Sequence, residues 1–134
     1  MLKSAALMAV LATPVAADDL MFFQSPSGNI FCMIATGEWA MARCDVMQLT
    51  NAVPPQPVDC DLDWGHAFAV ELQDMQGARV CAGDTVADPN GMTLGYGDQI
   101  DLGGFRCTSE KSGMTCTNPG GHGFTVARAR QDLF

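Results

Sequence analysis

Positive charge is scarce in this sequence. Seven Lys and Arg residues stand against fifteen Asp and Glu residues, so the formal net charge is −8 at pH 7 with histidine neutral. A chain with this balance repels nucleic acid and anionic lipid surfaces, and neither is expected as a partner. An excess of negative charge on a small protein is typical of a surface that keeps the molecule soluble.

Long apolar runs are also missing, apart from one at the N-terminus. That run, residues 5–12, is well short of the ~20 residues that a membrane-spanning helix needs. Lys3 precedes the run, and Val15 and Ala17 occupy the small-residue positions before a cut. This layout predicts a secretory signal peptide over residues 1–17, with cleavage after Ala17. We therefore expect a periplasmic or secreted protein whose mature chain is not inserted in a membrane.

The predicted mature chain, residues 18–134, has a length that suits one domain with a small core. Its six basic and fifteen acidic residues give it a net charge of −9. We expect a single disulfide-stabilised β domain that is present as a monomer.

Closely spaced cysteine pairs are absent, so a zinc site of the Cys-x-x-Cys type is not expected, and no cofactor is predicted. The sequence has six cysteines, all within residues 18–134. An even number in an exported chain indicates a disulfide framework, although six cysteines allow 15 connectivities. We expect nearest neighbours to pair, because each such pair brackets a predicted hairpin or short loop, and each bridge would stabilise the fold by about 2–4 kcal/mol. The expected pairs are Cys32–Cys44, Cys60–Cys81 and Cys107–Cys116.

Helical periodicity is weak along the chain, with one short helical turn predicted at residues 129–133. Short alternating segments separated by Gly, Pro and Asp turns instead predict antiparallel hairpins. The predicted hairpins pair residues 29–35 with 39–46, 68–72 with 78–81, and 105–109 with 114–116. The sequence therefore predicts an all-β fold, a small antiparallel β-barrel or sandwich built of short hairpins and stapled by three disulfides.

The last of these hairpins has a predicted register. Pairing Cys107 with Cys116 places Thr108 opposite Thr115, across a four-residue connection at residues 110–113. A glycine at the end of such a connection supplies the positive φ that these turns commonly need.

Three aspartates are spaced like the first three ligands of a calcium loop. They are Asp59, Asp61 and Asp63. The glycine of the pattern arrives one residue late, at Gly65, and position twelve is Val70 where the pattern has glutamate. We therefore expect a solvated acidic turn and no effect of calcium on stability.

His66 and His122 are the two histidines of the sequence, and each lies beside a glycine in a predicted turn. A histidine in a turn commonly satisfies neighbouring backbone groups, which is the role we expect for both. A metal site using both with a carboxylate is an open alternative. No Gly-x-Ser-x-Gly nucleophile elbow is present.

The aromatic residues include one candidate for a binding face, Trp64, which we group with His66 and His122. Most of the other large aromatics are expected in the core, because they bury the most apolar area in a small protein. The nine methionines are expected to fill irregular gaps in that core.

Seven short motifs occur together in residues 22–134. They are Phe23-x-Ser-Pro-Ser-Gly-Asn-Ile-x-Cys32, Ala42-Arg-Cys44-Asp, Asp63-Trp-Gly65, Cys81-x-Gly-Asp-Thr85, Leu94-Gly-Tyr-Gly97, Cys107-Thr-Ser and Gly121-His-Gly-Phe124. With this set the chain resembles a family of small secreted proteins of proteobacteria and actinobacteria that is classified as a domain of unknown function. The resemblance implies a secreted module with structural disulfides and no assigned activity.

Three functions are consistent with these observations. We expect a non-enzymatic exported module of the cell envelope that binds a protein or another envelope component, including the kind that inhibits a secreted enzyme. One alternative is a small extracytoplasmic hydrolase that uses His66 or His122 with a carboxylate, and both histidines in one pocket with a nucleophile would favour it. The other alternative is a structural envelope protein.

Overall fold

The computed structural model describes residues 2, 5–6, 8–10 and 18–134. Of the predicted signal peptide, residues 1, 3–4, 7 and 11–17 lie outside the described residues, and these include Ala17 at the predicted cleavage position. No helix in the described part of the chain is long and apolar enough to cross a membrane. The strands are β1 Leu20–Gln24, β2 Ile30–Ala35, β3 Met41–Val46, β4 Asp63–Glu71, β5 Ala78–Ala82, β6 Met92–Thr93, β7 Gln99–Leu102, β8 Phe105–Glu110, β9 Gly113–Thr117, β10 Gly123–Val126 and β11 Gln131–Leu133.

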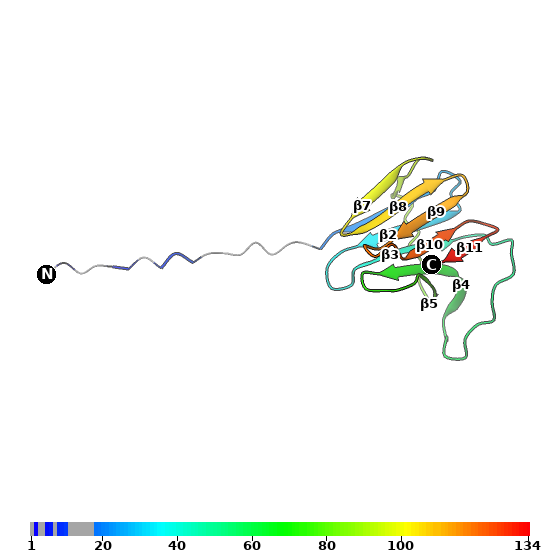
Figure 1. The fold of residues 1–134 in the computed structure, drawn as a ribbon, viewed down its shortest axis with the longest axis horizontal. Coiled ribbons are helices and arrows are strands. Elements are labelled where there is room, and N and C mark those ends of the chain that lie inside the picture. Colours follow the sequence, from blue (N-terminus) through cyan, green and yellow to red (C-terminus); the bar gives the residue numbers. More distant parts are fainter. Residues whose placement is uncertain (1, 3–4, 7, 11–17) are drawn as a thin grey trace.

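The strands form two sheets, each built mainly from consecutive hairpins (Figure 1). The first sheet has the order β5-β4-β3-β2-β1-β6, and the second has the order β11-β10-β9-β8-β7. Neighbouring strands pair antiparallel, except that the two-residue strand β6 pairs parallel with β1. The expected all-β fold is confirmed, and of the two predicted architectures the structure is the sandwich.

The core lies between the two sheets because apolar residues alternate along their strands. In β2, Ile30, Cys32 and Ile34 are buried while the residues between them are half-buried. Four phenylalanines from both sheets are fully buried, and the rings of Phe68 and Phe124 lie 6.3 Å apart across the sandwich. These four are Phe23, Phe68, Phe105 and Phe124.

The methionines are mostly not in the core, which corrects the expectation from the sequence. Met114 is fully buried, whereas Met47, Met75 and Met92 are exposed. The reason is that β-branched residues, phenylalanines and disulfides fill the space between the sheets, which leaves few irregular gaps for flexible side chains.

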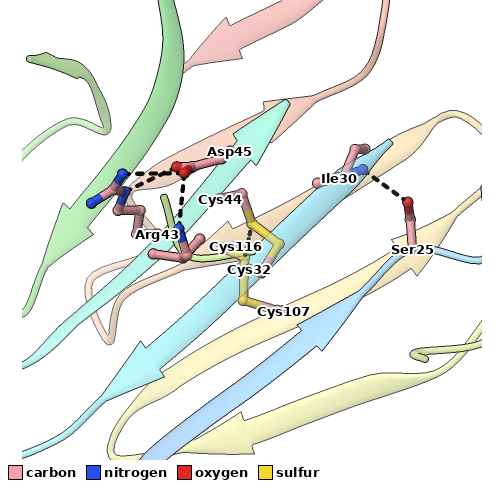
Figure 2. Close-up of a disulfide and its surroundings, with 9 residues drawn as sticks. Ser25, Ile30, Cys32, Arg43, Cys44, Asp45, Cys107 and Cys116 are labelled. Carbon is pink, nitrogen blue, oxygen red and sulfur yellow. Dashed lines mark hydrogen bonds and ion pairs between the residues drawn. A yellow bond between two sulfur atoms is a disulfide. The ribbon is translucent and has the colours of Figure 1, made fainter. Parts of the chain in front are cut away.

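Two disulfides face each other in the middle of the core (Figure 2). Cys32–Cys44 joins β2 to β3 in the first sheet, and Cys107–Cys116 joins β8 to β9 in the second. The Sγ atoms of Cys44 and Cys116 are 3.7 Å apart. The third bridge, Cys60–Cys81, ties the loop before β4 to the edge strand β5. These are the three pairs expected from the sequence.

The predicted register of the β8–β9 hairpin is confirmed, since Cys107 pairs with Cys116 and Thr108 with Thr115. The connection is shorter than expected. Glu110 and Gly113 still pair with each other, so the turn itself is Lys111–Ser112.

The predicted helical turn at residues 129–133 is wrong. Residues Gln131–Leu133 form β11 and pair with Phe124–Val126 of β10. Beyond β11, the carbonyl oxygen of Phe134 accepts hydrogen bonds from the amides of Gly77 (3.0 Å) and Gly123 (2.7 Å). The sheet edge thus supplies long-range backbone partners, and these outweigh a weak local preference for helix.

Candidate functional site

Trp64 and His66 line one groove with a volume of about 630 Å³, which we call the Trp64 groove. It lies at the end of the sandwich where β3 finishes and β4 begins. Asp63 and Met47 contribute to its walls, and so does the loop that follows β5. Two of the three candidate binding residues therefore lie together.

Strand β4 begins earlier than the sequence suggested, and this places the two side chains. The sequence predicted a strand from residue 68, with His66 in a turn, but β4 starts at Asp63. The pairing with β5 is irregular between Asp63 and Ala67, because the register shifts there. Trp64 and His66 lie two positions apart on β4, a spacing that puts side chains on one face of a strand, and both line the groove.

Gly65, between these two side chains, allows a loop to pack closely against the strand. Its φ is +113°, and a Cβ at this position would meet the side chain of Val53 at 2.8 Å. The indole Nε1 of Trp64 donates a hydrogen bond to the Pro54 carbonyl oxygen at 3.0 Å. The proline-containing loop, residues 48–57, therefore holds the half-buried Trp64 ring in place.

His66 has a defined tautomer. Its Nδ1 lies 2.7 Å from the carbonyl oxygen of Val46. A carbonyl can only accept, so Nδ1 carries the proton and donates it. The second ring nitrogen, Nε2, has no hydrogen-bond partner among the described residues and is available to a ligand in the groove.

A buried ion pair supports the wall of the groove (Figure 2). The Arg43 guanidinium binds both carboxylate oxygens of Asp45, at 2.9 and 3.1 Å, and Asp84 Oδ1 at 3.0 Å. Asp45 also accepts a hydrogen bond from the Val86 amide at 3.1 Å. These contacts attach the loop after β5 to the outer face of β3.

The charges of this cluster are mutually stabilised. Burial opposes the charge on Arg43, but its hydrogen bonds to Asp45 and Asp84 hold the pKa of Arg43 above its usual value. The hydrogen bond from Arg43, followed by its positive charge, lowers the pKa of the Asp84 carboxyl.

Arg43, Asp45 and Asp84 were not predicted as site residues from the sequence. Alternation along β3 would place Arg43 and Asp45 on the solvent side, opposite Cys44, and the loop that covers them comes from residues far along the chain. A usable signal was present, because the three residues lie in the motifs Ala42-Arg-Cys44-Asp and Cys81-x-Gly-Asp-Thr85.

The three aspartates with calcium-loop spacing do not gather into a site. Asp59, Asp61 and Asp63 are all exposed, and Asp63 is already part of β4. Within the described residues, no group of three His, Cys, Asp or Glu side chains is placed to hold a metal ion.

His122 lies in the turn between β9 and β10, at the opposite end of the sandwich from His66. Its ring makes no hydrogen bond to any residue that the structure describes. Asn118 satisfies this turn instead, because its Oδ1 accepts from the amides of Gly120 and His122, both at 3.0 Å. The expected backbone role of His122 is therefore taken by a residue that the sequence analysis missed.

The glycines on either side of His122 are required for different reasons. Gly121 has a φ of +81°, a conformation that a residue with a Cβ rarely adopts. Gly123 has no such angle, but a Cβ there would collide with the Cys116 carbonyl oxygen of the neighbouring strand.

A family model described as a family of unknown function (DUF6636) matches residues 3–134. The chain belongs to this family. No curated protein and no solved structure matches the chain. The resemblance to a family of unknown function is thus confirmed, while the family's secretion, its bacterial groups and the particular motifs stay predictions.

In this DUF6636 protein, the Trp64 groove combines an aromatic ring with hydrogen-bond acceptors. Asp63 and Asp84 present carboxylates, and His66 presents Nε2. The Arg43 charge is already matched by Asp45 and Asp84, so it leaves little positive charge for a ligand. Such a set suits a cationic group, which an aromatic face and carboxylates both attract.

Proposed function

We propose that this protein is an exported, non-enzymatic binding module of the cell envelope that holds a basic peptide segment of a partner protein in the Trp64 groove. The observation that carries this proposal is the convergence of Trp64, Asp63 and Asp84 on one groove of about 630 Å³. That volume is within the range of about 300–1,000 Å³ that is typical of ligand pockets.

The charge of the whole chain favours a basic partner. Residues 18–134 carry a net charge of −9. An acidic protein attracts a cationic partner over distances of about a Debye length and raises its association rate. At short range, a lysine or arginine over the Trp64 ring would add a cation–π contact.

The groove is held in shape before any partner arrives. The loop with Pro54 fixes the indole, and the Cys60–Cys81 bridge ties the residues that follow this loop to β5. The Arg43–Asp45 pair anchors the loop after β5. A preformed groove loses less conformational entropy on binding, which favours a recognition role.

The hydrolase alternative gains no specific support. It needs a nucleophile and a carboxylate in hydrogen-bond contact with one histidine. Among the described residues, the hydrogen bond of the His66 ring is to the Val46 carbonyl, and His122 lies at the other end of the molecule.

An extracytoplasmic location forms part of the proposal. Three disulfides are compatible with an oxidising compartment, where such bridges form and persist. The predicted signal peptide also supports an extracytoplasmic location.

The experiment is a peptide selection on the folded, oxidised protein. A random heptapeptide library displayed on phage is expected to yield binders enriched in Lys and Arg. Binding of the selected synthetic peptides should weaken at least about tenfold in Trp64→Ala, which corresponds to about 1.4 kcal/mol. Asp63→Asn should also weaken peptide binding.

Matched controls are available at the other end of the sandwich. Trp39 is 77% exposed in the loop between β2 and β3, and Glu38 beside it is exposed. Trp39→Ala and Glu38→Gln should leave peptide affinity unchanged. Selected peptides without basic residues, or an equal loss in Trp39→Ala, would refute the proposal.

A further inference from the structure

A second groove, of about 440 Å³, opens at the same end of the sandwich, between the β1–β2 turn and the β8–β9 turn. We propose that it binds the oxyanion, a carboxylate or a phosphate, of a small ligand. We call it the basic groove and define it by the residues that would contact the anion. They are Ser27, Tyr96, Lys111 and Arg128. It has Met47 in common with the Trp64 groove, but the proposal does not depend on the function of that groove.

Two positive charges that are not paired with carboxylates of the described residues gather at this groove. Of the six basic residues in residues 18–134, three form ion pairs with carboxylates, and a fourth, Arg79, lies with its guanidinium carbon 5.0 Å from the centroid of the Phe68 ring. The three paired residues are Arg43, Arg106 and Arg130. The remaining two, Lys111 and Arg128, both line the basic groove.

These two cations have no carboxylate partner among the described residues. Arg128 is positioned by neutral groups, since its Nη2 donates to the Gln48 side-chain oxygen at 2.9 Å and its carbonyl accepts from the Thr50 amide at 2.9 Å. Its other guanidinium hydrogens are available to a ligand. Glu110 is the one carboxylate that lines the groove, so the local balance is positive in a strongly acidic molecule.

The wall of the groove also holds a hydroxyl hydrogen that lacks an acceptor. Ser25, which is 5% exposed and lies in the groove wall, has its Oγ 2.9 Å from Ser27 Oγ. Each oxygen also accepts a backbone amide, Ile30 N at 3.2 Å for Ser25 and Asn29 N at 3.3 Å for Ser27. The two hydroxyl groups carry two hydrogens, but the single hydrogen bond between them uses one hydrogen. The other hydrogen has no protein acceptor, and the exposed Ser27 can donate it outward.

These groups are mainly donors. Lys111 and Arg128 donate only, Ser27 has a hydrogen to spare, and the hydroxyl of Tyr96 has no partner among the described residues. A groove rich in donors favours a ligand rich in acceptors. The negatively charged oxygens of a carboxylate or a phosphate are the strongest acceptors of this kind.

The net charge of the protein restricts the size of this ligand. A long polyanion would be repelled by a molecule of net charge −9. A ligand with one or two negative charges instead experiences mainly the nearby cations, because charges beyond about 8 Å are screened at physiological salt. The groove therefore fits a small carboxylated or phosphorylated molecule.

The test is a titration of the ¹⁵N-labelled, disulfide-bonded protein with inorganic phosphate and, separately, with glucuronate, at constant ionic strength. Saturable shifts are expected for the amides of Gly28, Lys111 and Arg128. Saturation by phosphate alone would identify phosphorylated ligands, and saturation by glucuronate alone would identify carboxylated ones. Either result, or both, supports the site.

The variant Lys111→Gln/Arg128→Gln should weaken binding of the active probe at least tenfold, and Ser27→Ala should weaken it by a smaller factor. Arg130→Gln is the matched control, because it removes an exposed, ion-paired cation that does not line the groove, and it should bind as the wild type does. The absence of saturable shifts with both probes would overturn the proposal. An equal loss in Arg130→Gln would also overturn it, because the effect would then be one of net charge.

Discussion

Arg43 and Asp45 form a buried ion pair. The side chain of Arg43 is 11% exposed and that of Asp45 is 5% exposed. Removing both charges from water costs several kcal/mol, which their mutual attraction must offset. The bidentate geometry and the Val86 amide satisfy the hydrogen-bonding groups of the pair. The free energy of folding is therefore lost mainly when one charge is removed and the other stays buried without its partner.

Replacement of Asp45 by Asn is therefore expected to destabilise the protein by about 3–5 kcal/mol, because it leaves Arg43 buried with only the exposed Asp84 as a counter-charge. Urea unfolding measures the loss. Asp101→Asn, which breaks the exposed pair between Asp101 and Arg106, should shift the midpoint little. A similar loss in both variants would contradict the special role of the buried pair.

Asp84 provides a prediction about acid stability. Its folded-state pKa lies below the usual value of 3.8, so around that pH the folded state binds fewer protons than the unfolded state. The stabilisation is complete above pH 3.8 and is lost as the pH falls through the lowered pKa. The Asp84 side chain is 79% exposed, so the effect should stay under about 1 kcal/mol.

The advantage of the wild type over Asp84→Asn should therefore shrink as the pH is lowered from about 5 to about 2. Urea midpoints measured across this range test the sign. The exposed Asp61 makes no ion pair among the described residues, and Asp61→Asn serves as the control. An advantage that grows on acidification would contradict the ion-pair account.

At the scale of single elements, the β9–β10 turn depends on a buried asparagine. Asn118 is 4% exposed, and its Nδ2 donates to the carbonyl oxygens of Glu71 at 3.0 Å and Asp74 at 2.8 Å. Its Oδ1 accepts the two turn amides described above. One side chain thus connects the second sheet to the β4–β5 turn of the first.

We expect Asn118→Ala to cost at least about 2–3 kcal/mol, because several backbone groups in a buried setting lose their partner together. His122→Ala should change the free energy of unfolding by less than about 0.5 kcal/mol, since its ring makes no hydrogen bond among the described residues. Chemical denaturation of both variants gives the comparison. A larger loss in His122→Ala would show that the imidazole organises the turn after all.

The two facing disulfides give a prediction about exchange. If Cys107 is replaced by Ser, the free Cys116 sulfur lies 3.7 Å from Cys44. Its thiolate can attack Cys44 Sγ, form a Cys44–Cys116 bond and release Cys32 as a thiolate. The single variant should therefore scramble, whereas Cys107→Ser/Cys116→Ser should keep Cys32–Cys44 and lose about 2–4 kcal/mol.

Non-reducing peptide mapping separates these outcomes. The single variant is expected to contain Cys44–Cys116 and a free Cys32, and the double variant to contain an intact Cys32–Cys44 bridge. An intact Cys32–Cys44 bridge in the single variant would show that the core blocks the required geometry.

At the scale of the whole molecule, two hairpin sheets enclose one core, and both grooves open at one end. The turns and strand ends at this end come from both sheets. Loops at the end of a sandwich tolerate changes in sequence better than the core does, which suits them to recognition.

The predicted signal peptide leads to an expectation about processing. The protein expressed with residues 1–17 in a bacterial host should accumulate outside the cytoplasm with Asp18 as its first residue. Intact-mass analysis of the exported material measures this. Ala17→Phe places a bulky side chain at the position before the cut and should block cleavage, whereas exported wild-type protein that retains Met1 would refute the prediction.

Much of the fold could be predicted because its main contacts are local. Cys32 and Cys44 are 12 residues apart and Cys107 and Cys116 are 9 apart, so each pair forms within one hairpin. A period of two in burial and a turn signal are sufficient to set such a register. The amino-acid sequence by itself determined the class, three of the hairpins and the bridges.

The sites were decided by the tertiary structure, because their members come from distant parts of the chain. Asp84 reaches Arg43 across 41 residues, and Arg128 lines the same groove as Ser27 although an even longer stretch of chain separates them. Nothing in a local pattern states which loop will cover which face, since that depends on how two sheets stack. The sequence supplied the cations, carboxylates and aromatic rings, and the packing of the sheets assembled them into grooves.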